Sequence, residues 1–292
     1  MLPNILLFVF DALRRDHLVD AVMPRTDAVA KQGIRYLSAY TDVGVTDLSA
    51  SMMIYGINVL GLGCDAPQFS SLPERLGDNY SSLAVLASGL LCNPTAAQLW
   101  TTFDTIWKCT DDTGEPYRYR PYLYPEKALG AFRELIWQQP QPWFAYFHVF
   151  PVHDPYRGDD GEYVEIDPSH PGLNAERYQQ YCTWADTFYA PLLEEHVASG
   201  GLLVVTSDHG EALGNNGRFG HGEPRLWTLP SVREIPLAVV GPGIEPIEEE
   251  TPISNAEVPR LICQSLGLHF EPILDMQPKR YPVGNLPPDG KR

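Results

Sequence analysis

Two adjacent residues, Asp208 and His209, have the types and spacing of a metal site. They follow the apolar run Gly201–Thr206 after one intervening residue, Ser207, and are succeeded by Gly210. A carboxylate and an imidazole just past a strand can reach one cation from the same turn, and glycine permits the sharp bend that follows. A strand-capping Asp beside a surface His is the alternative. The pair therefore predicts a divalent-cation site, provided that other ligands lie nearby.

Asp11 and Thr46 could supply those ligands. Asp11 ends the apolar run Asn4–Phe10, and Thr46 precedes a segment of small and Met residues that closes at Gly56. Both residues are also good helix caps, and we expect Thr46 to be an N-cap. A helix N-terminus favours a bound phosphate or sulfate. A Thr hydroxyl coordinated to a metal there would be a competent nucleophile.

Three histidines differ in their surroundings. His153 lies in a loop beyond the apolar run Trp143–Phe150 and can face a crevice at the end of that run. His221 stands between two glycines, which suggests a loop that approaches something closely. Either residue could equally be an ordinary loop histidine. We interpret His148, inside the apolar run, as a hydrogen-bonded core residue.

The elements that must position these residues alternate between strand and helix. This order predicts the α/β class, with a mostly parallel central sheet sandwiched by helices and a ligand crevice beyond the carboxyl ends of the strands. We expect one domain over residues 1–275 and a Pro/Gly-rich tail over 276–292. Continuous apolar runs predict strands, and amphipathic or capped segments predict helices. The strands are expected at Asn4–Phe10, Leu83–Leu91, Trp143–Phe150, Gly201–Thr206 and Ile235–Val240, and the helices at Pro24–Gly33, Asp47–Tyr55, Pro125–Gln138, Ala175–Ser199 and Asn255–Leu266.

Composition narrows the possible partners. The chain has 292 residues, with 21 Lys and Arg against 37 Asp and Glu, and a formal net charge of −16 at pH 7. This acidity argues against nucleic-acid binding, and an anionic substrate would need a metal or local positive groups. No run approaches the roughly 20 apolar residues of a membrane span, so we expect no membrane partner. The run Ile5–Phe10 is a poor signal peptide, which favours a cytoplasmic location. The oligomeric state stays open.

Four segments together resemble the alkaline phosphatase superfamily, specifically its sulfatase-like branch. Asn4–Leu18 resembles the opening strand with its metal-binding Asp. Thr46–Gly56 resembles the nucleophile helix, with the nucleophile ten residues before a Gly and Ser49 three residues after it. His148–Tyr156 resembles the "H…H-x-P-Y" loop, and Leu202–Gly222 the Asp-His-Gly segment. The segments occur in the family's order, and the resemblance spans most of the chain.

The resemblance implies a sulfatase-like core with a reduced C-terminal subdomain. It implies metal ligation by Asp11, Thr46, Asp208 and His209. It also implies substrate contact, or a second metal, at His153 and His221. Oxygen ligands with one imidazole suit Mn²⁺, Zn²⁺, Mg²⁺ or Ca²⁺. The implied cofactor is one divalent ion, with a second left open, and the implied partner is a small-molecule anionic ester.

The nucleophile segment departs from true sulfatases. In their C/S-x-P-x-R pattern, this sequence has Thr46 at the Cys or Ser position, Leu48 at the Pro position and Ala50 at the Arg position. A Thr cannot give the formylglycine aldehyde. Thr-nucleophile branches, such as nucleotide pyrophosphatase/phosphodiesterases and lipoteichoic acid synthase-like transferases, act on phosphate esters. We therefore expect a metal-dependent hydrolase of phosphate or phosphonate esters that works through a covalent Thr intermediate. The alternatives are a sulfuric ester hydrolase, a phosphotransferase, and an inactive metal- or anion-binding protein.

Overall fold

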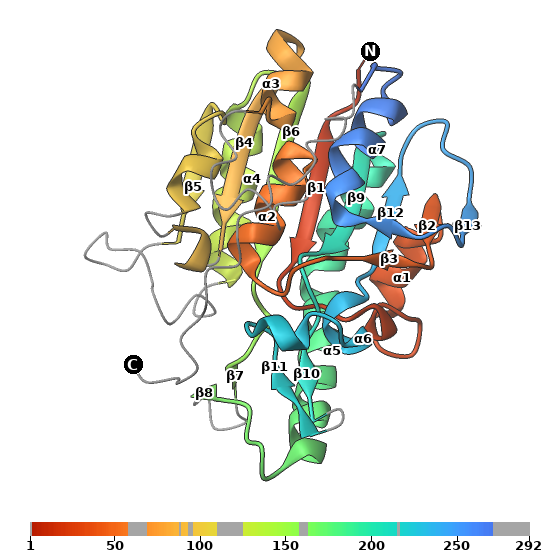
Figure 1. The fold of residues 1–292 in the computed structure, drawn as a ribbon. Helices are drawn as coiled ribbons and strands as arrows, with labels where there is room; N and C mark the ends of the chain where they lie inside the picture. Colours follow the sequence, from red (N-terminus) through yellow and green to blue (C-terminus); the bar gives the residue numbers. More distant parts are fainter. Residues whose placement is uncertain are drawn as a thin grey trace, which may run out of the picture.

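A mixed sheet of eight strands forms the centre of the molecule (Figure 1). The computed structural model describes residues 2–57, 69–87, 89–92, 96–109, 125–157, 163–214 and 217–270. In spatial order the strands are β13 (Ile247–Glu249), β2 (Ile34–Tyr36), β12 (Leu237–Val240), β9 (Leu202–Ser207), β1 (Ile5–Phe10), β6 (Trp143–Val149), β4 (Ser81–Leu86) and β5 (Thr105–Lys108). The five strands from β9 to β5 are parallel to one another, and β12 runs antiparallel to β9 and β2.

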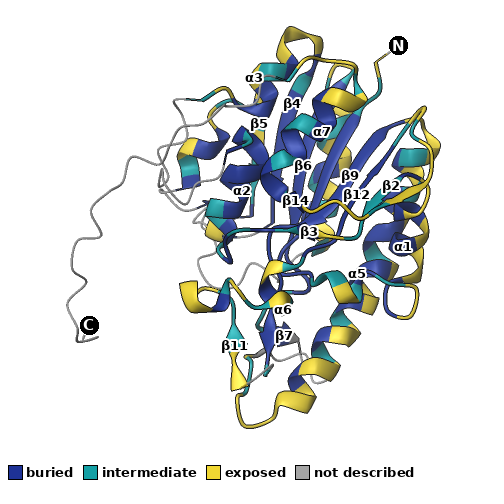
Figure 2. Ribbon diagram, turned by 45° about the vertical axis from the view of Figure 1, so that its right-hand side comes forward, coloured by how far each residue is buried: buried dark blue, intermediate teal, exposed yellow. Residues whose placement is uncertain are grey.

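The central strands are apolar throughout because both faces of the sheet are covered. In β1, Ile5, Leu7 and Val9 enter one hydrophobic cluster, while the alternate residues enter the other. Figure 2 shows the resulting layers, with buried strands between helices whose outer faces are exposed. On the first face lie α2 (Thr46–Tyr55), α3 (Leu72–Leu76) and α7 (Val258–Ser265), and on the second lie α1 (Pro24–Ala30), α4 (Pro125–Gln138) and α5 (Pro171–Ala198).

Smaller elements complete the fold. Three two-stranded sheets accompany the main one, and a short helix, α6 (Pro230–Arg233), follows the 3-10 helix Pro224–Leu226. The small sheets are β3 (Ala39–Tyr40) with β14 (Ile253–Ser254), β7 (Tyr156–Arg157) with β8 (Tyr163–Val164), and β10 (Ala212–Leu213) with β11 (Phe219–Gly220). Further 3-10 helices span Arg15–His17, Gly77–Asn79, Gly89–Cys92, Ala96–Trp100 and Asn255–Glu257.

The predicted fold class is confirmed, and several element boundaries are corrected. The strand expected at Leu83–Leu91 ends at Leu86, and a 3-10 helix follows at Gly89–Cys92. Thr46 is not the N-cap: Val45 takes that place with extended dihedrals, and Thr46 is the first helical residue. The expected tail over 276–292 lies outside the described residues. Among the residues that are described, no helix is both long enough and apolar enough to cross a membrane.

The topology gathers the chemistry-bearing residues at one edge of the sheet. β1 lies between β6 and β9, and Phe10 is in register with both Val149 and Ser207. Since all three strands are parallel, their carboxyl ends meet at the same edge. Asp11 and Asp208, which come directly after two of these strands, are therefore neighbours. In Figure 1, α6 and the small strands β7, β10 and β11 lie beyond this edge.

Candidate active site

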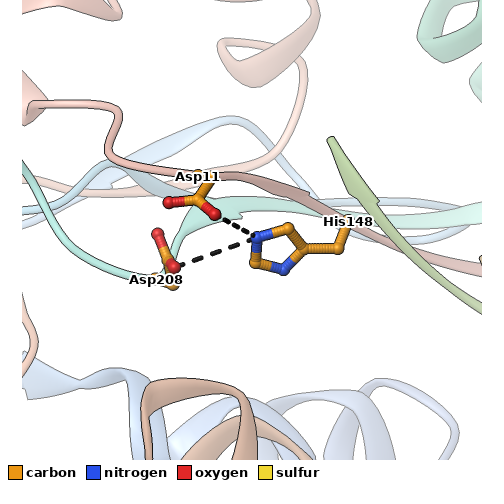
Figure 3. A group of neighbouring side chains, drawn as sticks. All are labelled: Asp11, His148 and Asp208. Atoms are coloured by element: carbon orange, nitrogen blue, oxygen red, sulfur yellow. Dashed lines mark hydrogen bonds and ion pairs between the residues drawn. The ribbon is translucent and has the colours of Figure 1, made fainter. Parts of the chain in front are cut away.

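Two aspartates and one histidine from three neighbouring strands form the buried floor of the site (Figure 3). Asp11, Asp208 and His148 are each 0% exposed. His148 Nε2 lies 3.2 Å from Asp11 Oδ2 and 3.8 Å from Asp208 Oδ2. The hydroxyl of Tyr146 lies 2.9 Å from His148 Nδ1. A carboxylate only accepts hydrogen bonds, so His148 donates through Nε2–H to Asp11, and in the neutral tautomer that carries this proton Nδ1 accepts from Tyr146.

The two carboxylates each keep one oxygen free to bind a cation. Asp208 Oδ1 accepts hydrogen bonds from the backbone N–H of Ala12, at 3.0 Å, and of His209, at 2.8 Å. Asp11 Oδ1 and Asp208 Oδ2 are buried and have no hydrogen-bond partner among the described residues. An isolated buried charge is costly unless it is paired or coordinates a metal. The donor set therefore fits a divalent cation, and two carboxylate oxygens would face it.

His209 offers the imidazole of this donor set. Its Nδ1–H donates to the backbone carbonyl of Gly210 at 3.0 Å, which leaves Nε2 as the unprotonated nitrogen. Nε2 lies 3.4 Å from Asp208 Oδ2 and 3.7 Å from Asp11 Oδ1. Burial is the largest influence on the pKa of His209 and lowers it, so the neutral form is favoured. Neutral imidazole with its second nitrogen hydrogen-bonded is the form that binds metals.

Thr46 approaches the carboxylates and His209 from α2, the helix that covers one face of the sheet. Its hydroxyl oxygen lies 3.3 Å from His209 Nε2, and the residue is 2% exposed. The helix α2 that begins at Thr46 ends at Gly56, whose φ of 70° suits a residue without Cβ. The first N–H groups of a helix have no acceptor within it, and the dipole makes this end positive. The hydroxyl therefore stands where an anion would be stabilised.

Two further histidines form the outer wall of the site. His153 Nε2 is buried, has no hydrogen-bond partner among the described residues and lies 3.9 Å from Asp11 Oδ1. The ring of His221 stacks on His209, with centroids 4.1 Å apart, and meets the ring of His153 edge-on at 4.8 Å. Both rings can therefore contact a ligand held by Asp11 and Thr46.

Glu211 anchors His221. Its Oε2 accepts the Nδ1–H of His221 at 3.1 Å, and the carboxylate is 0% exposed. Burial alone would lower the pKa of His221, but Glu211 outweighs it and raises that pKa to about 9. The imidazolium is thus the prevailing form at neutral pH. Its Nε2–H remains available as a proton donor.

The pKa values of the site acids diverge. Burial alone would raise the pKa of Asp11, but His153 and the hydrogen bond from His148 outweigh it and hold that pKa below its ordinary value. The pKa of Glu211 is likewise lowered, because His221 outweighs the effect of burial. Burial and the nearby Glu211 raise the pKa of Asp154 to about 6. At neutral pH, Asp11 and Glu211 are therefore both ionised, which suits binding to cations.

All six residues predicted from the sequence come together at this edge, and metal ligation by four of them remains a prediction. They are Asp11, Thr46, His153, Asp208, His209 and His221. His148 is the buried strand residue that was expected, yet its partner Asp11 makes it part of the site, which the sequence analysis missed. Glu211 was also missed. A charged residue directly after the Asp-His-Gly turn was the available signal for Glu211, and a polar residue inside an apolar strand was the signal for His148.

Known structures with the same fold include a phosphonate monoester hydrolase and a phosphoethanolamine transferase. A phosphonate monoester hydrolase of Agrobacterium radiobacter aligns with a TM-score of 0.69 and 17% identity, over 92% of this chain and 74% of that one. The C-terminal periplasmic domain of EcEptC from Escherichia coli, in complex with Zn, gives 0.66 and 17%, over 92% and 83%. The soluble domain of lipooligosaccharide phosphoethanolamine transferase A from Neisseria meningitidis gives 0.67 and 13%, over 90% and 87%.

Sequence comparison gives the family. No curated protein sequence matches significantly. The family model described as Sulfatase matches residues 3–268, which includes every residue of the site. The predicted resemblance to sulfatase-like proteins is thereby confirmed: the chain belongs to the Sulfatase family.

Proposed function

We propose that the protein is a metal-dependent phosphoesterase that uses Thr46 as a covalent nucleophile. The observation that carries this proposal is the position of the Thr46 hydroxyl. It lies 3.3 Å from His209 Nε2, at a helix N-terminus, on the side of the site where Asp11 and Asp208 present oxygens without partners. A nucleophile, a cation site and an anion-stabilising helix end therefore coincide.

One divalent ion would be held by Asp11, Asp208, His209 and the Thr46 hydroxyl. When bound, such an ion lowers the pKa of a coordinated hydroxyl and offsets charge on phosphoryl oxygens. Mn²⁺, Zn²⁺, Mg²⁺ and Ca²⁺ all accept this donor set, and the imidazole favours Mn²⁺ or Zn²⁺ over the other two. The Zn bound to the structurally similar Escherichia coli domain supports this choice.

The chain's own groups divide the chemistry between them. The Thr46 hydroxyl loses its proton to solvent, and the resulting alkoxide attacks phosphorus in line with the departing alcohol. The free N–H groups at the start of α2 donate to the equatorial oxygens. His221 protonates the leaving oxygen through Nε2–H, while its Nδ1–H remains hydrogen-bonded to Glu211. His153 contacts the phosphoryl group from the same side. Water, or an acceptor alcohol, then releases the phosphoryl group from Thr46 in a second displacement.

The preferred substrates are small phosphate diesters, phosphate monoesters or phosphonate esters. Thr46 cannot be converted to formylglycine, which argues against ordinary sulfate-ester hydrolysis. The family match to Sulfatase favours sulfate as the second candidate, and the transferase named among the similar structures favours transfer to an alcohol as the third. Parallel assays with a bis-aryl phosphate, an aryl phosphonate and an aryl sulfate separate these classes. An inactive protein would bind metal tightly and turn over none of the three.

Replacement of Thr46 tests the proposal directly. T46A should lower kcat by at least about a thousandfold, as removal of a nucleophile generally does, and acid quench of the wild type should trap a phosphoryl group on Thr46 detectable by mass spectrometry. S51A is the matched control, because Ser51 is a buried hydroxyl on the same helix without a hydrogen-bond partner among the described residues. Full turnover by T46A would end the proposal.

A further inference from the structure

A buried hydroxyl joins the nucleophile helix to the turn that carries Asp208. Ser49, three residues after Thr46 on α2, donates from Oγ to the backbone carbonyl of Asp208 at 2.7 Å. Both Ser49 and Asp208 are 0% exposed. This hydrogen bond spans the two layers that contribute to the site, since α2 covers one face of the sheet and Asp208 follows β9.

A second buried residue fixes the orientation of that hydroxyl. Asn255 begins the 3-10 helix that leads into α7, which lies beside α2 (Figure 1). Its Nδ2 donates to Ser49 Oγ at 2.7 Å and to Thr41 Oγ1 at 3.3 Å. Thr41 in turn donates to the backbone carbonyl of Val43, in the segment that leads into α2. Asn255 therefore contacts the hydroxyl on α2 and also braces the approach to this helix.

The hydrogen bonds that link Asn255, Ser49 and Asp208 allow only one assignment of donors and acceptors. The hydrogen of Ser49 Oγ is committed to the Asp208 carbonyl, so Ser49 must accept from its other neighbour, and only a donor can fill that place. Asn255 is 0% exposed, and its Oδ1 has no hydrogen-bond partner among the described residues. A buried acceptor without a partner is unfavourable, because it has lost its hydrogen bonds to water. A side chain selected for packing alone would be apolar here.

We propose that Asn255 is a positioning residue for the reaction: by donating to Ser49, it holds the Ser49–Asp208 hydrogen bond and thereby sets Thr46 against the cation ligands. This inference rests on the proposed function of Thr46. Residues that orient metal ligands generally contribute about 10- to 100-fold to metal affinity or activity. Asn255 lies 209 positions from Thr46 in sequence, and nothing in the local sequence marks it.

Two substitutions of similar size distinguish the hydrogen bond that Asn255 donates from the packing of its side chain. N255L removes the donor, and N255D replaces the donating amide with an acceptor, which would draw the Ser49 hydrogen away from Asp208. Both variants should lower kcat about 10- to 100-fold with a smaller change in KM, and both should weaken Zn²⁺ binding to the metal-free protein, measured by calorimetry, by about tenfold. N174D is the matched control, because Asn174 is equally buried but hydrogen-bonds only to the backbone of Asp167.

A double-mutant cycle shows whether Asn255 acts through Ser49. S49A should reproduce the loss, and S49A/N255L should be no worse than S49A alone, since residues of one network are not additive. The inference would be overturned if N255D kept the wild-type kcat and Zn²⁺ affinity while its melting temperature fell as much as that of N174D. Additive losses of kcat in S49A/N255L would also overturn it. If N255L does not fold, N255D and S49A carry the same test. Failure of the proposed function would appear separately, as retained turnover in T46A.

Discussion

At the scale of single residues, the site depends on pairs whose members are far apart in the chain. Asp11 and His148 are 137 positions apart, and Thr46 and His209 are 163 positions apart. The residue types at strand ends predicted Asp11, Asp208 and His209, because parallel strands end at a common edge. They could not predict that His148 points at Asp11, since strand periodicity does not state which buried polar residue meets which partner.

The pair of Glu211 and His221 gives a residue-scale prediction about pH. Because Glu211 raises the pKa of His221 to about 9, E211Q should lower that pKa towards or below the ordinary 6.5. His221 donates a proton only while protonated, so wild-type activity should fall as the pH rises through about 9, and the decline in E211Q should begin at lower pH. Titration of the metal-free protein by NMR, with H221N to assign the resonance, measures the shift.

A pKa of His221 that does not fall in E211Q would contradict this prediction. A His221 pKa that stays near 9 in E211Q would mean that another group supplies the charge. Activity that increases above pH 9 in the wild type would show that His221 does not act as the donor.

At the scale of elements, the long buried strands were predictable and the short ones were not. The sequence correctly indicated β1, β6 and β9, because strands covered on both faces read as continuous apolar runs. β2 and β13 are three residues each, with half-buried or exposed side chains, and carry no such signal. The apolar residues Leu90 and Leu91 extended the predicted strand past Leu86, because a short apolar run does not distinguish a strand from a buried turn.

The turn after β9 gives an element-scale prediction. The N–H of Gly210 donates to the Val232 carbonyl at 2.7 Å, and a Cβ at position 210 would lie 2.1 Å from the Ser231 carbonyl oxygen. G210A must therefore push the turn away from α6 and displace His209. We expect stability to fall by about 1–3 kcal/mol and Zn²⁺ affinity to fall about tenfold, measured by urea unfolding and calorimetry.

Gly172, near the start of α5, provides the control for G210A. A Cβ there would meet nothing within 4 Å, so G172A should be neutral or stabilise the fold by up to about 1 kcal/mol. Equal behaviour of the two variants would show that the close packing of the turn on α6 does not position the site.

At the scale of the whole molecule, the formal net charge of −16 opposes anionic substrates. This repulsion acts over about 30 Å at 10 mM salt and about 8 Å at 150 mM. KM for an anionic phosphodiester should therefore fall about two- to tenfold over that range, while kcat stays constant. Steady-state kinetics in NaCl at fixed metal concentration measure the effect. A KM that increases with salt would instead indicate a local positive surface that attracts the substrate.

The central claim is that a cation lies between the ends of β1 and β9 with Thr46 as one of its ligands. Anomalous diffraction at the zinc edge, from crystals grown with Zn²⁺, tests it most directly. The account predicts one strong peak at about 2.0–2.2 Å from Asp11 Oδ1, Asp208 Oδ2, His209 Nε2 and the Thr46 hydroxyl. A peak bound by other residues, or one that leaves the Thr46 hydroxyl outside coordination distance, would contradict it.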